Sequence, residues 1–240
     1  MKLFLVHLYP EHLNLYGDRG NILALYQRAN WRGIELEVLP VGLGDSLDPD
    51  KADILFMGGG QDAQQLRVAK DLKQKAESIN TAVSNGAVML GICGGYQLMG
   101  HYYQPHDGDR LEGLSLMDAY TVAGDKRMIG NVSIVRPSGQ TVVGFENHSG
   151  KTFLGPGVKP LGKVINGYGN NGEDEQEGAC VGNLYGTYLH GSLLPKNPAL
   201  TDELLLKALQ KSHGQNVKLE PLEFAIETAA HQKALLICKK

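Results

Sequence analysis

Short apolar runs alternate with longer stretches of mixed polarity through the first hundred residues, and this alternation limits the folds open to the chain. The apolar runs predict strands at residues 3–8, 34–39, 52–57 and 87–90. The longer stretches predict helices at residues 21–30, 61–84 and 97–103. Strands that alternate with helices favour a largely parallel sheet with helices on its faces, so we expect an α/β fold. Functional sites of such folds lie at the carboxyl ends of the strands.

The second half of the chain predicts additions to this sheet. Shorter apolar runs predict antiparallel strands that join the same sheet, at residues 129–135, 141–145 and 162–165. The acidic, glycine-bearing stretch 170–177 predicts a solvated loop, and residues 181–189 predict one more strand. A capped helix is expected to open at Thr201, and a last helix covers about 220–237. No repeat or long linker divides the sequence, so we expect one domain over residues 1–240.

Composition narrows the class of protein. The 240 residues are 42% hydrophobic and 20% charged, as in ordinary globular proteins, and the net charge is −3. Because the sequence has no basic block, we do not expect it to bind nucleic acid. The apolar runs are too short to cross a bilayer, and no signal peptide is expected. Three widely spaced cysteines match neither a disulfide framework nor a zinc pattern, which favours a reduced, cytoplasmic protein without a metal.

Cys93 stands among glycines at the end of a predicted strand, in the sequence GICGGYQ. A nucleophile placed between glycines on a strand-to-helix turn is exposed and free of neighbouring side chains. The amide N–H of Gly94 would point toward the same place, and the amino terminus of the following helix stabilises a thiolate. The alternative is a buried, inert cysteine beside a tight turn, and the glycines alone leave both interpretations open.

Two further motifs favour a reactive cysteine. GGGQD follows the strand at 52–57, and a triple glycine frees backbone N–H groups for an anion or an oxyanion. No Lys-Ser or Lys-Thr pair follows, so a P-loop is a poor fit, and a plain flexible loop is the other interpretation. His190 ends a predicted strand in GTYLHG and can be the base that a cysteine nucleophile needs, although a single histidine is more often structural.

Six motifs occur in order along nearly the whole chain: LNLYGDRGNILAL (13–25), DILFMGGGQD (53–62), GICGGYQLMG (91–100), GDKRMIGN (124–131), GFENHSG (144–150) and GTYLHG (186–191). Together they resemble the class I, triad-type glutamine amidotransferases and, among these, the cobyric-acid-synthase-like (CobB/CobQ-like) branch. Within that branch they resemble the glutaminase subunits of lipid II isoglutaminyl synthase.

The resemblance implies a flavodoxin-like α/β fold and hydrolysis of L-glutamine to glutamate and ammonia. It also implies a heterodimer with a MurT-like subunit of the Mur-ligase family, which would receive the ammonia. That partner would amidate the α-carboxyl of D-glutamate in the stem peptide of lipid II, during peptidoglycan synthesis. ATP and Mg are expected on the partner and no cofactor in this chain, which would reach the inner face of the membrane through its complex.

On these residues, the resemblance implies that Cys93 is the nucleophile and His190 the general acid and base. Backbone N–H groups of Gly59, Gly60 and Gly94 would form the oxyanion hole.

Arg127, in GDKRMIGN, is implied as the contact for the α-carboxylate of glutamine, which a planar guanidinium binds bidentately. By composition alone it is a solvated loop charge. Gln97, one turn after Cys93, is expected either to position glutamine or to pack the helix start. Asn147 and His148 would line the pocket or the surface that meets the partner.

Many class I enzymes carry an acid two residues after the histidine, and here Ser192 occupies that position. Glu146 is a candidate to orient His190 instead, although a hydrogen-bonded structural role is the commoner one for such a residue. Asp18 and Arg19 are expected to cap the first helix, with contact to the partner as the second interpretation. Without an orienting group, the isolated chain would be a slow glutaminase that awaits its partner.

Three other functions stay open from the sequence. They are a glutaminase subunit for another acceptor such as a cobyrinate-type corrinoid, a Cys-His peptide hydrolase, and a non-catalytic regulatory subunit. The corrinoid enzymes usually carry a fused synthetase domain, for which 240 residues leave no room. The motifs GDKRMIGN and GFENHSG argue against a peptide hydrolase, and the intact Cys93 and His190 argue against a non-catalytic subunit.

Overall fold

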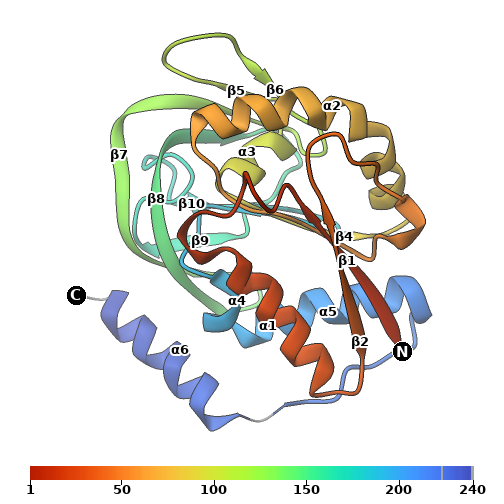
Figure 1. Ribbon diagram of the computed structural model, residues 1–240. Helices are drawn as coiled ribbons and strands as arrows, with labels where there is room; N and C mark the ends of the chain where they lie inside the picture. The colour runs from red at the N-terminus through yellow and green to blue at the C-terminus, as the bar shows by residue number, and fades with distance from the viewer. Residues whose placement is uncertain (223, 239–240) are drawn as a thin grey trace.

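The computed structural model describes residues 1–222 and 224–238, and its centre is a six-stranded sheet (Figure 1). The strands are β1 (Lys2–Leu8), β2 (Glu35–Val41), β3 (Ile54–Met57), β4 (Val88–Ile92), β11 (Ala179–Val181) and β12 (Leu184–Thr187). Their order is β11-β12-β4-β3-β1-β2, and every neighbouring pair is parallel except β11 and β12. The predicted α/β fold with a mostly parallel sheet is confirmed.

Helices cover both faces of this sheet, as Figure 1 shows. One face carries α2 (Asp62–Ser84) and α3 (Gly94–Met99); the other carries α1 (Arg19–Asn30) and α5 (Pro198–His213), with α4 (Leu193–Lys196) against α1. Every residue of β3 and β4 is buried, which explains their continuous apolar sequence. Met57 pairs with Gly91, so the two glycine clusters lie side by side at one edge of the sheet.

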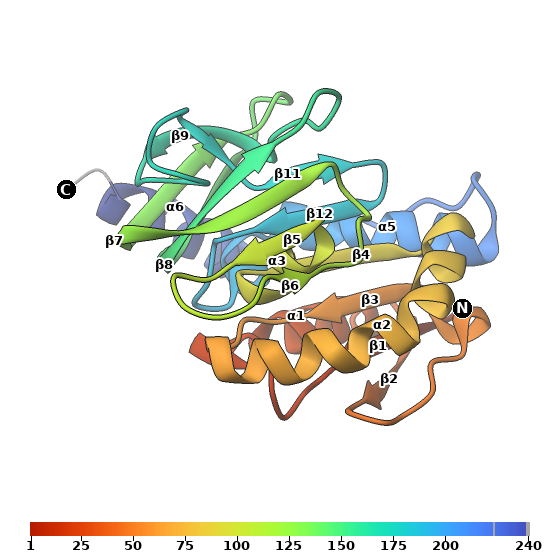
Figure 2. The same ribbon diagram turned by 90° about the horizontal axis from the view of Figure 1, so that it is seen from above.

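The middle of the chain forms a second sheet. Its strands are β5 (Tyr102–Gln104), β6 (Leu111–Glu112), β7 (Ala119–Val135), β8 (Thr141–Leu154), β9 (Gly162–Asn166) and β10 (Gln176–Glu177). The prediction that this region extends the central sheet is wrong, because the long strands β7 and β8 pair with each other along most of their length. Figure 2 shows this sheet beyond β12, where an isolated bridge joins Phe145 of β8 to His190.

Two element boundaries differ from the prediction at the edges of the central sheet. The helix expected at 97–103 begins at Gly94 and ends at Met99, because the next residues form β5, where Tyr102 stacks on Tyr120. The strand expected at 181–189 is present but shorter, as β12, because Gly182, with a φ of 59°, turns the chain between β11 and β12.

Three predictions in the last third of the chain also need correction. The stretch 170–177 is only in part the solvated loop expected, because residues 172–175 are exposed but Asn170 is buried and its side chain exchanges hydrogen bonds of 2.9 and 2.8 Å with the Gly178 backbone. The helix expected at Thr201 starts at Pro198, and Thr201 is buried within its first turn. The last helix, α6 (Ala225–Cys238), begins five residues later than expected.

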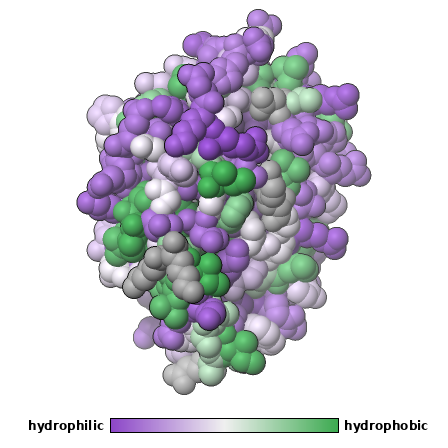
Figure 3. All heavy atoms as spheres, turned by 90° about the vertical axis from the view of Figure 1, so that its left-hand side faces the viewer, coloured by the Kyte–Doolittle hydropathy of each residue, from purple (hydrophilic) through white to green (hydrophobic). Residues whose placement is uncertain are grey.

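α6 lies against β7, β8 and α4, away from the central sheet. The face of the molecule that carries α6 and β7 shows scattered apolar side chains (Figure 3), and the exposed apolar residues of the helix are Ile226, Leu236 and Ile237. Within the described ranges, no helix has the length and apolarity needed to span a membrane.

Candidate active site

Cys93 lies at the sharp turn between β4 and α3. Its backbone has φ 51° and ψ −105°, a combination that residues with side chains rarely adopt, so the turn is strained. The glycines around it are required by space. A Cβ at Gly95 would overlap the carbonyl oxygen of Met57, and one at Gly91 would lie 2.5 Å from the sulfur of Met99. The turn leaves the Cys93 side chain at the wall of a cavity.

His190 follows β12 and is fully buried. Because β12 pairs in parallel with β4, the residues after these two strands lie at the same edge of the sheet. The His190 backbone exchanges hydrogen bonds of 2.7 and 3.3 Å with Phe145, which holds it at the junction of the two sheets. A Cβ at Gly59 would lie 2.9 Å from His190 Cε1 and 3.4 Å from Cys93 Cβ, so only glycine fits beside both groups.

A carboxylate reaches His190 from the loop before α1. Asp18 Oδ1 lies 3.7 Å from His190 Nδ1, and both side chains are fully buried. Asp18 Oδ2 accepts a 2.7 Å hydrogen bond from the Gly59 amide. Asp18 occupies the N-cap position of α1, but its side chain makes no capping hydrogen bond, and Asn14 accepts from the Arg19 amide instead. The predicted capping role of Asp18 is therefore wrong.

The charge state of His190 follows from its neighbours. Burial alone lowers the pKa of His190, but the negatively charged sulfur of Cys93 and the Asp18 carboxylate outweigh burial and raise this pKa to about 10. The imidazolium is then the stable form of His190 at neutral pH. Cys93, His190 and Asp18 therefore have the order of a nucleophile, its base and the acid that orients the base.

Glu146, the candidate orienting residue, and Ser192, which stands at the usual position of the acid, are both engaged elsewhere. Ser192 Oγ donates to the Gly17 carbonyl at 2.5 Å, which holds the loop immediately before Asp18. The Glu146 carboxylate accepts hydrogen bonds of 2.7 and 2.9 Å from two backbone amides of the segment after β9. The sequence signal for Asp18 was its place in the motif LYGDRGN. Its contact with His190 depends on the packing of the loop after β1.

Two of the three glycines expected to form an oxyanion hole have amides that stay available. The Gly59 N–H donates to Asp18, so it is not directed at a substrate. Among the described residues, the amides of Gly60 and Gly94 donate to no acceptor. A Cβ at Gly94 would lie 3.2 Å from the Gly60 nitrogen, so these two residues are in close contact beside Cys93. Paired amides next to a nucleophile are what an oxyanion hole requires.

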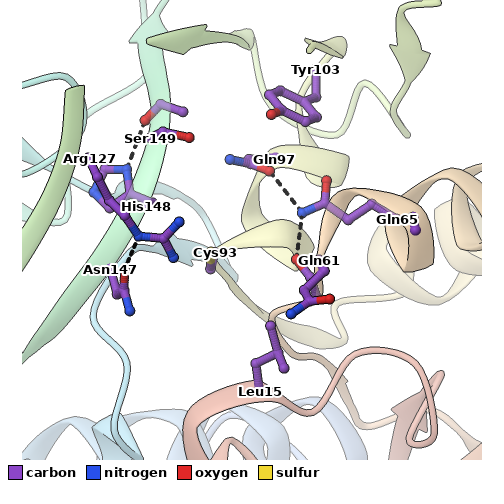
Figure 4. Close-up of a pocket in the computed structure, with 13 residues that line it drawn as sticks. Leu15, Gln61, Gln65, Cys93, Gln97, Tyr103, Arg127, Asn147, His148 and Ser149 are labelled. Atoms are coloured by element: carbon purple, nitrogen blue, oxygen red, sulfur yellow. Dashed lines mark hydrogen bonds between the residues drawn. The ribbon is translucent and has the colours of Figure 1, made fainter. Parts of the chain in front are cut away.

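A cavity of about 440 Å³ opens at Cys93, a size that suits a small amino acid (Figure 4). One wall comes from β7 and β8 and the other from α2 and α3, as the side chains of Arg127, Asn147, His148, Gln65 and Gln97 show. Arg127 Nε donates to Asn147 Oδ1 at 2.6 Å, and the terminal guanidinium nitrogens bond no described acceptor. They are free to bind a carboxylate. No group of three or more His, Cys, Asp or Glu side chains suited to a metal ion occurs among the described residues.

Gln97 both lines the cavity and packs against its neighbours. Its Nε2 donates to the hydroxyl of Tyr188 at 3.1 Å, and its Oε1 accepts from Gln65 Nε2 at 3.2 Å. The Tyr188 hydroxyl also bonds Thr152 Oγ1 at 2.7 Å, which ties the Gln97 amide to the second sheet. Sequence reasoning missed Gln65, because it lies in a helix with no motif of its own.

Glu177 gives the site region a pH-dependent stability. Burial raises the pKa of Glu177 to about 7, despite hydrogen bonds from Thr187 and the Tyr188 amide. A raised pKa means that the folded state keeps a proton that the unfolded state loses, so stability falls as pH rises from about 4.5 to about 7. At pH 8 we expect Glu177→Gln to be more stable than the wild type by about 2–3 kcal/mol. Urea unfolding at pH 5 and pH 8 measures this.

The exposed Glu173, in the loop that precedes β10, offers a control. Glu173→Gln should leave the pH dependence of unfolding as in the wild type. Equal slopes for the wild type and Glu177→Gln between pH 5 and pH 8 would contradict the prediction.

Known proteins that are similar in sequence to this chain are glutamine amidotransferases. A sequence profile of the CobB/CobQ-like glutamine amidotransferase domain matches residues 5–198. GatD of Staphylococcus aureus (strain N315), a subunit of the glutamine-hydrolysing lipid II isoglutaminyl synthase, is 42% identical over 236 residues, or 98% of this chain and 95% of that protein. GatD of Streptococcus pneumoniae (strain ATCC BAA-255 / R6) is 44% identical over 92% of this chain and 86% of that protein.

More distant similarities agree with this placement. A cobyric acid synthase of Listeria monocytogenes is 31% identical over 60% of this chain and 29% of that protein. Among solved structures, the glutaminase domain of Trypanosoma brucei CTPS with bound acivicin aligns with a TM-score of 0.50, covering 91% of this chain and 96% of that one. Its 11% identity makes this a likeness of fold alone. The chain therefore belongs to the CobB/CobQ-like glutamine amidotransferases, in the branch of the GatD subunits of lipid II isoglutaminyl synthase.

Proposed function

We propose that this chain hydrolyses L-glutamine to glutamate and ammonia at Cys93 and His190, as the glutaminase subunit of a two-subunit amidotransferase. One observation carries the proposal. Cys93 opens onto a cavity that is walled by the guanidinium of Arg127, and His190 and the Asp18 carboxylate lie behind it. A free amino acid brings both an amide for the sulfur and a carboxylate for the guanidinium, whereas an internal peptide segment would leave the guanidinium unpaired.

The chemistry follows from these groups. The Cys93 thiolate attacks the side-chain amide carbon of glutamine, and the amides of Gly60 and Gly94 stabilise the oxyanion that forms. His190 gives its proton to the leaving nitrogen, so ammonia departs and a glutamyl thioester remains. Water then attacks the thioester and gives a proton to His190. The thioester bond breaks, so glutamate leaves and the Cys93 thiolate and the His190 imidazolium are restored. Asp18 holds the imidazole in position and stabilises its charge through both steps.

We propose a MurT-like synthetase of the Mur-ligase family as the partner that receives the ammonia. The support is the identity of 42% and 44% with two GatD proteins, each a subunit of lipid II isoglutaminyl synthase. On the partner, ATP and Mg would activate the α-carboxyl of D-glutamate in the lipid II stem peptide for amidation. This chain itself would need no cofactor, and the complex would work in the cytoplasm, at the inner face of the membrane.

A cobyrinate-type corrinoid is the second candidate acceptor. It is favoured by the 31% identity with a cobyric acid synthase. This chain spans 29% of that protein but 95% and 86% of the two GatD subunits, so lipid II is the better supported acceptor.

Ammonia release tests the function. The purified chain should release ammonia from L-glutamine, and co-expression with a MurT-like subunit should raise the rate. The complex with ATP, Mg and lipid II should then yield amidated lipid II, whereas a corrinoid acceptor should give no product. If neither the isolated chain nor the complex releases ammonia, the proposed function is wrong.

Arg127 should determine the affinity for glutamine. We expect Arg127→Ala to raise KM for L-glutamine by roughly 10- to 100-fold with a smaller change in kcat, because the carboxylate contact exists before and during the reaction. Arg127→Lys should restore little, since a point charge cannot replace a bidentate guanidinium. The control is Lys126→Ala, because that side chain lies over the Tyr168 ring and should not affect KM. An unchanged KM in Arg127→Ala would refute the role.

A further inference from the structure

Gln65 is a buried side chain in the cavity wall that the mechanism above does not use. It lies in the first turn of α2, is 2% exposed, and lines the same cavity as Cys93. Its Nε2 donates two hydrogen bonds, to the Gly60 carbonyl at 3.1 Å and to Gln97 Oε1 at 3.2 Å. Because a carbonyl only accepts, the nitrogen must face Gly60, and this settles the orientation of the amide.

These contacts hold together the two residues that supply the oxyanion donors. A Cβ at Gly94 would overlap Gln65 Nε2, so the amide packs directly on Gly94 while it bonds Gly60. Gln65 thereby connects the triple-glycine loop to the helix that follows Cys93.

The other end of the amide has no such partner. Gln65 Oε1 is buried, and no hydrogen-bond donor reaches it from the described part of the chain. An unpaired buried carbonyl oxygen is costly, so one on a side chain that lines a binding cavity points to a donor on the ligand. Figure 4 shows the Gln65 amide across the cavity from Arg127 and Asn147.

Glutamine supplies a fitting donor in its α-ammonium group. None of the described side chains that line the cavity is a carboxylate, so neutral acceptors must bind this cation. We infer that Gln65 Oε1 accepts a hydrogen bond from the α-ammonium of bound glutamine and that Gln65 thereby selects a free amino acid over other primary amides. The inference rests on the proposed function. His148 Nε2, also buried in the cavity wall without a hydrogen bond, is the rival acceptor.

A substrate pair isolates this contact. Glutaramic acid has the side-chain amide and the carboxylate of glutamine but no α-ammonium group. The complete chain, in complex with its synthetase subunit, is assayed for ammonia release from both compounds. The wild type should prefer L-glutamine in kcat/KM. In Gln65→Met, we expect kcat/KM for L-glutamine to fall roughly 10- to 100-fold more than that for glutaramic acid, the range for a hydrogen bond to a charged group.

A second variant separates binding of the α-ammonium group from support of the triple-glycine loop. Gln65→Glu keeps an oxygen at this place but loses the amide that donates to both Gly60 and Gln97. It should keep the preference for L-glutamine while kcat falls with both substrates. Gln64→Met is the matched control, since Oε1 of this neighbouring glutamine is also buried without a hydrogen bond but the residue does not line the cavity. It should match the wild type with both substrates.

The outcomes distinguish this inference from the function on which it rests. A wild type that releases no ammonia from glutamine refutes the function. The inference alone is overturned if wild-type activity depends on Cys93 but kcat/KM of Gln65→Met falls equally for both substrates. If Gln65→Met does not fold, Gln65→Glu decides, because a folded Gln65→Glu without preference for L-glutamine would also overturn it. A preference that disappears only in His148→Phe would assign the contact to the rival.

Discussion

We expect Cys93→Ala to abolish the release of ammonia from L-glutamine, with a loss of at least roughly 10⁴-fold in kcat, because no other group can form the thioester. The fold should persist, since the backbone turn depends on Gly91 and Gly95 rather than on the sulfur. A coupled glutamate dehydrogenase assay of the chain and of its complex measures the rate, and circular dichroism measures the fold.

The other two cysteines provide the control. Burial raises the pKa of both the Cys180 and Cys238 thiols, so neither should be a ready nucleophile. Cys180→Ala should keep full activity, and limited alkylation at neutral pH should label Cys93 first, as read by peptide mass spectrometry. Preferential labelling of Cys180, or ammonia release by Cys93→Ala, would contradict the assigned mechanism.

Asp18→Asn should have the second largest effect. An amide cannot stabilise the imidazolium of His190, so we expect kcat to fall roughly 10²- to 10⁴-fold. The pKa of His190, raised to about 10 in the wild type, should move down because one of its two supports is lost. NMR titration of the His190 ring measures this shift directly.

The sign of the pH effect on stability follows from the same pKa. A folded-state pKa above the ordinary 6.5 means that the imidazolium interactions contribute fully below about pH 6.5 and are lost as pH rises toward 10. In Asp18→Asn the loss should begin at the same pH but end at a lower pH, so the total decrease in stability with pH should be smaller. Urea unfolding of the wild type and the variant between pH 6 and pH 10 tests this.

Asp45 supplies the matched control for Asp18. Its carboxylate also accepts a hydrogen bond from a backbone amide, that of Gly42 at 2.8 Å, but at an exposed turn. Asp45→Asn should leave kcat and the titration of His190 unchanged. Full activity of Asp18→Asn in the complex would indicate that the partner subunit orients the histidine instead.

Much of the central sheet was predictable because its signals are local. β3 and β4 are buried on both faces, so they appear in the sequence as apolar runs, and each ends at a glycine cluster. A cysteine among glycines after such a strand already predicts a sharp turn, and the rule for parallel sheets places Cys93 near other strand ends. The position of His190 after another strand of the sheet follows by the same reasoning.

Other features could not be predicted, because the sequence pattern does not show which strand a strand pairs with or which group a polar side chain bonds. The antiparallel strands were recognisable, but their separation into a second sheet depends on β7 pairing with β8. Asn170 looked solvated because its residue type favours loops, yet its side chain bonds the Gly178 backbone and is buried.

The sequence by itself determined the parallel sheet, the sharp turn at Cys93 and the ordered motifs of the family, because periodicity, glycine content and residue order are properties of the chain. Only the tertiary structure decided that Asp18 meets His190, that the Gly59 amide is occupied by this carboxylate, and that Gln65 joins the two oxyanion glycines. These contacts join segments that lie far apart in the sequence. Tertiary packing brings the segments together, and no local sequence pattern predicts the contacts.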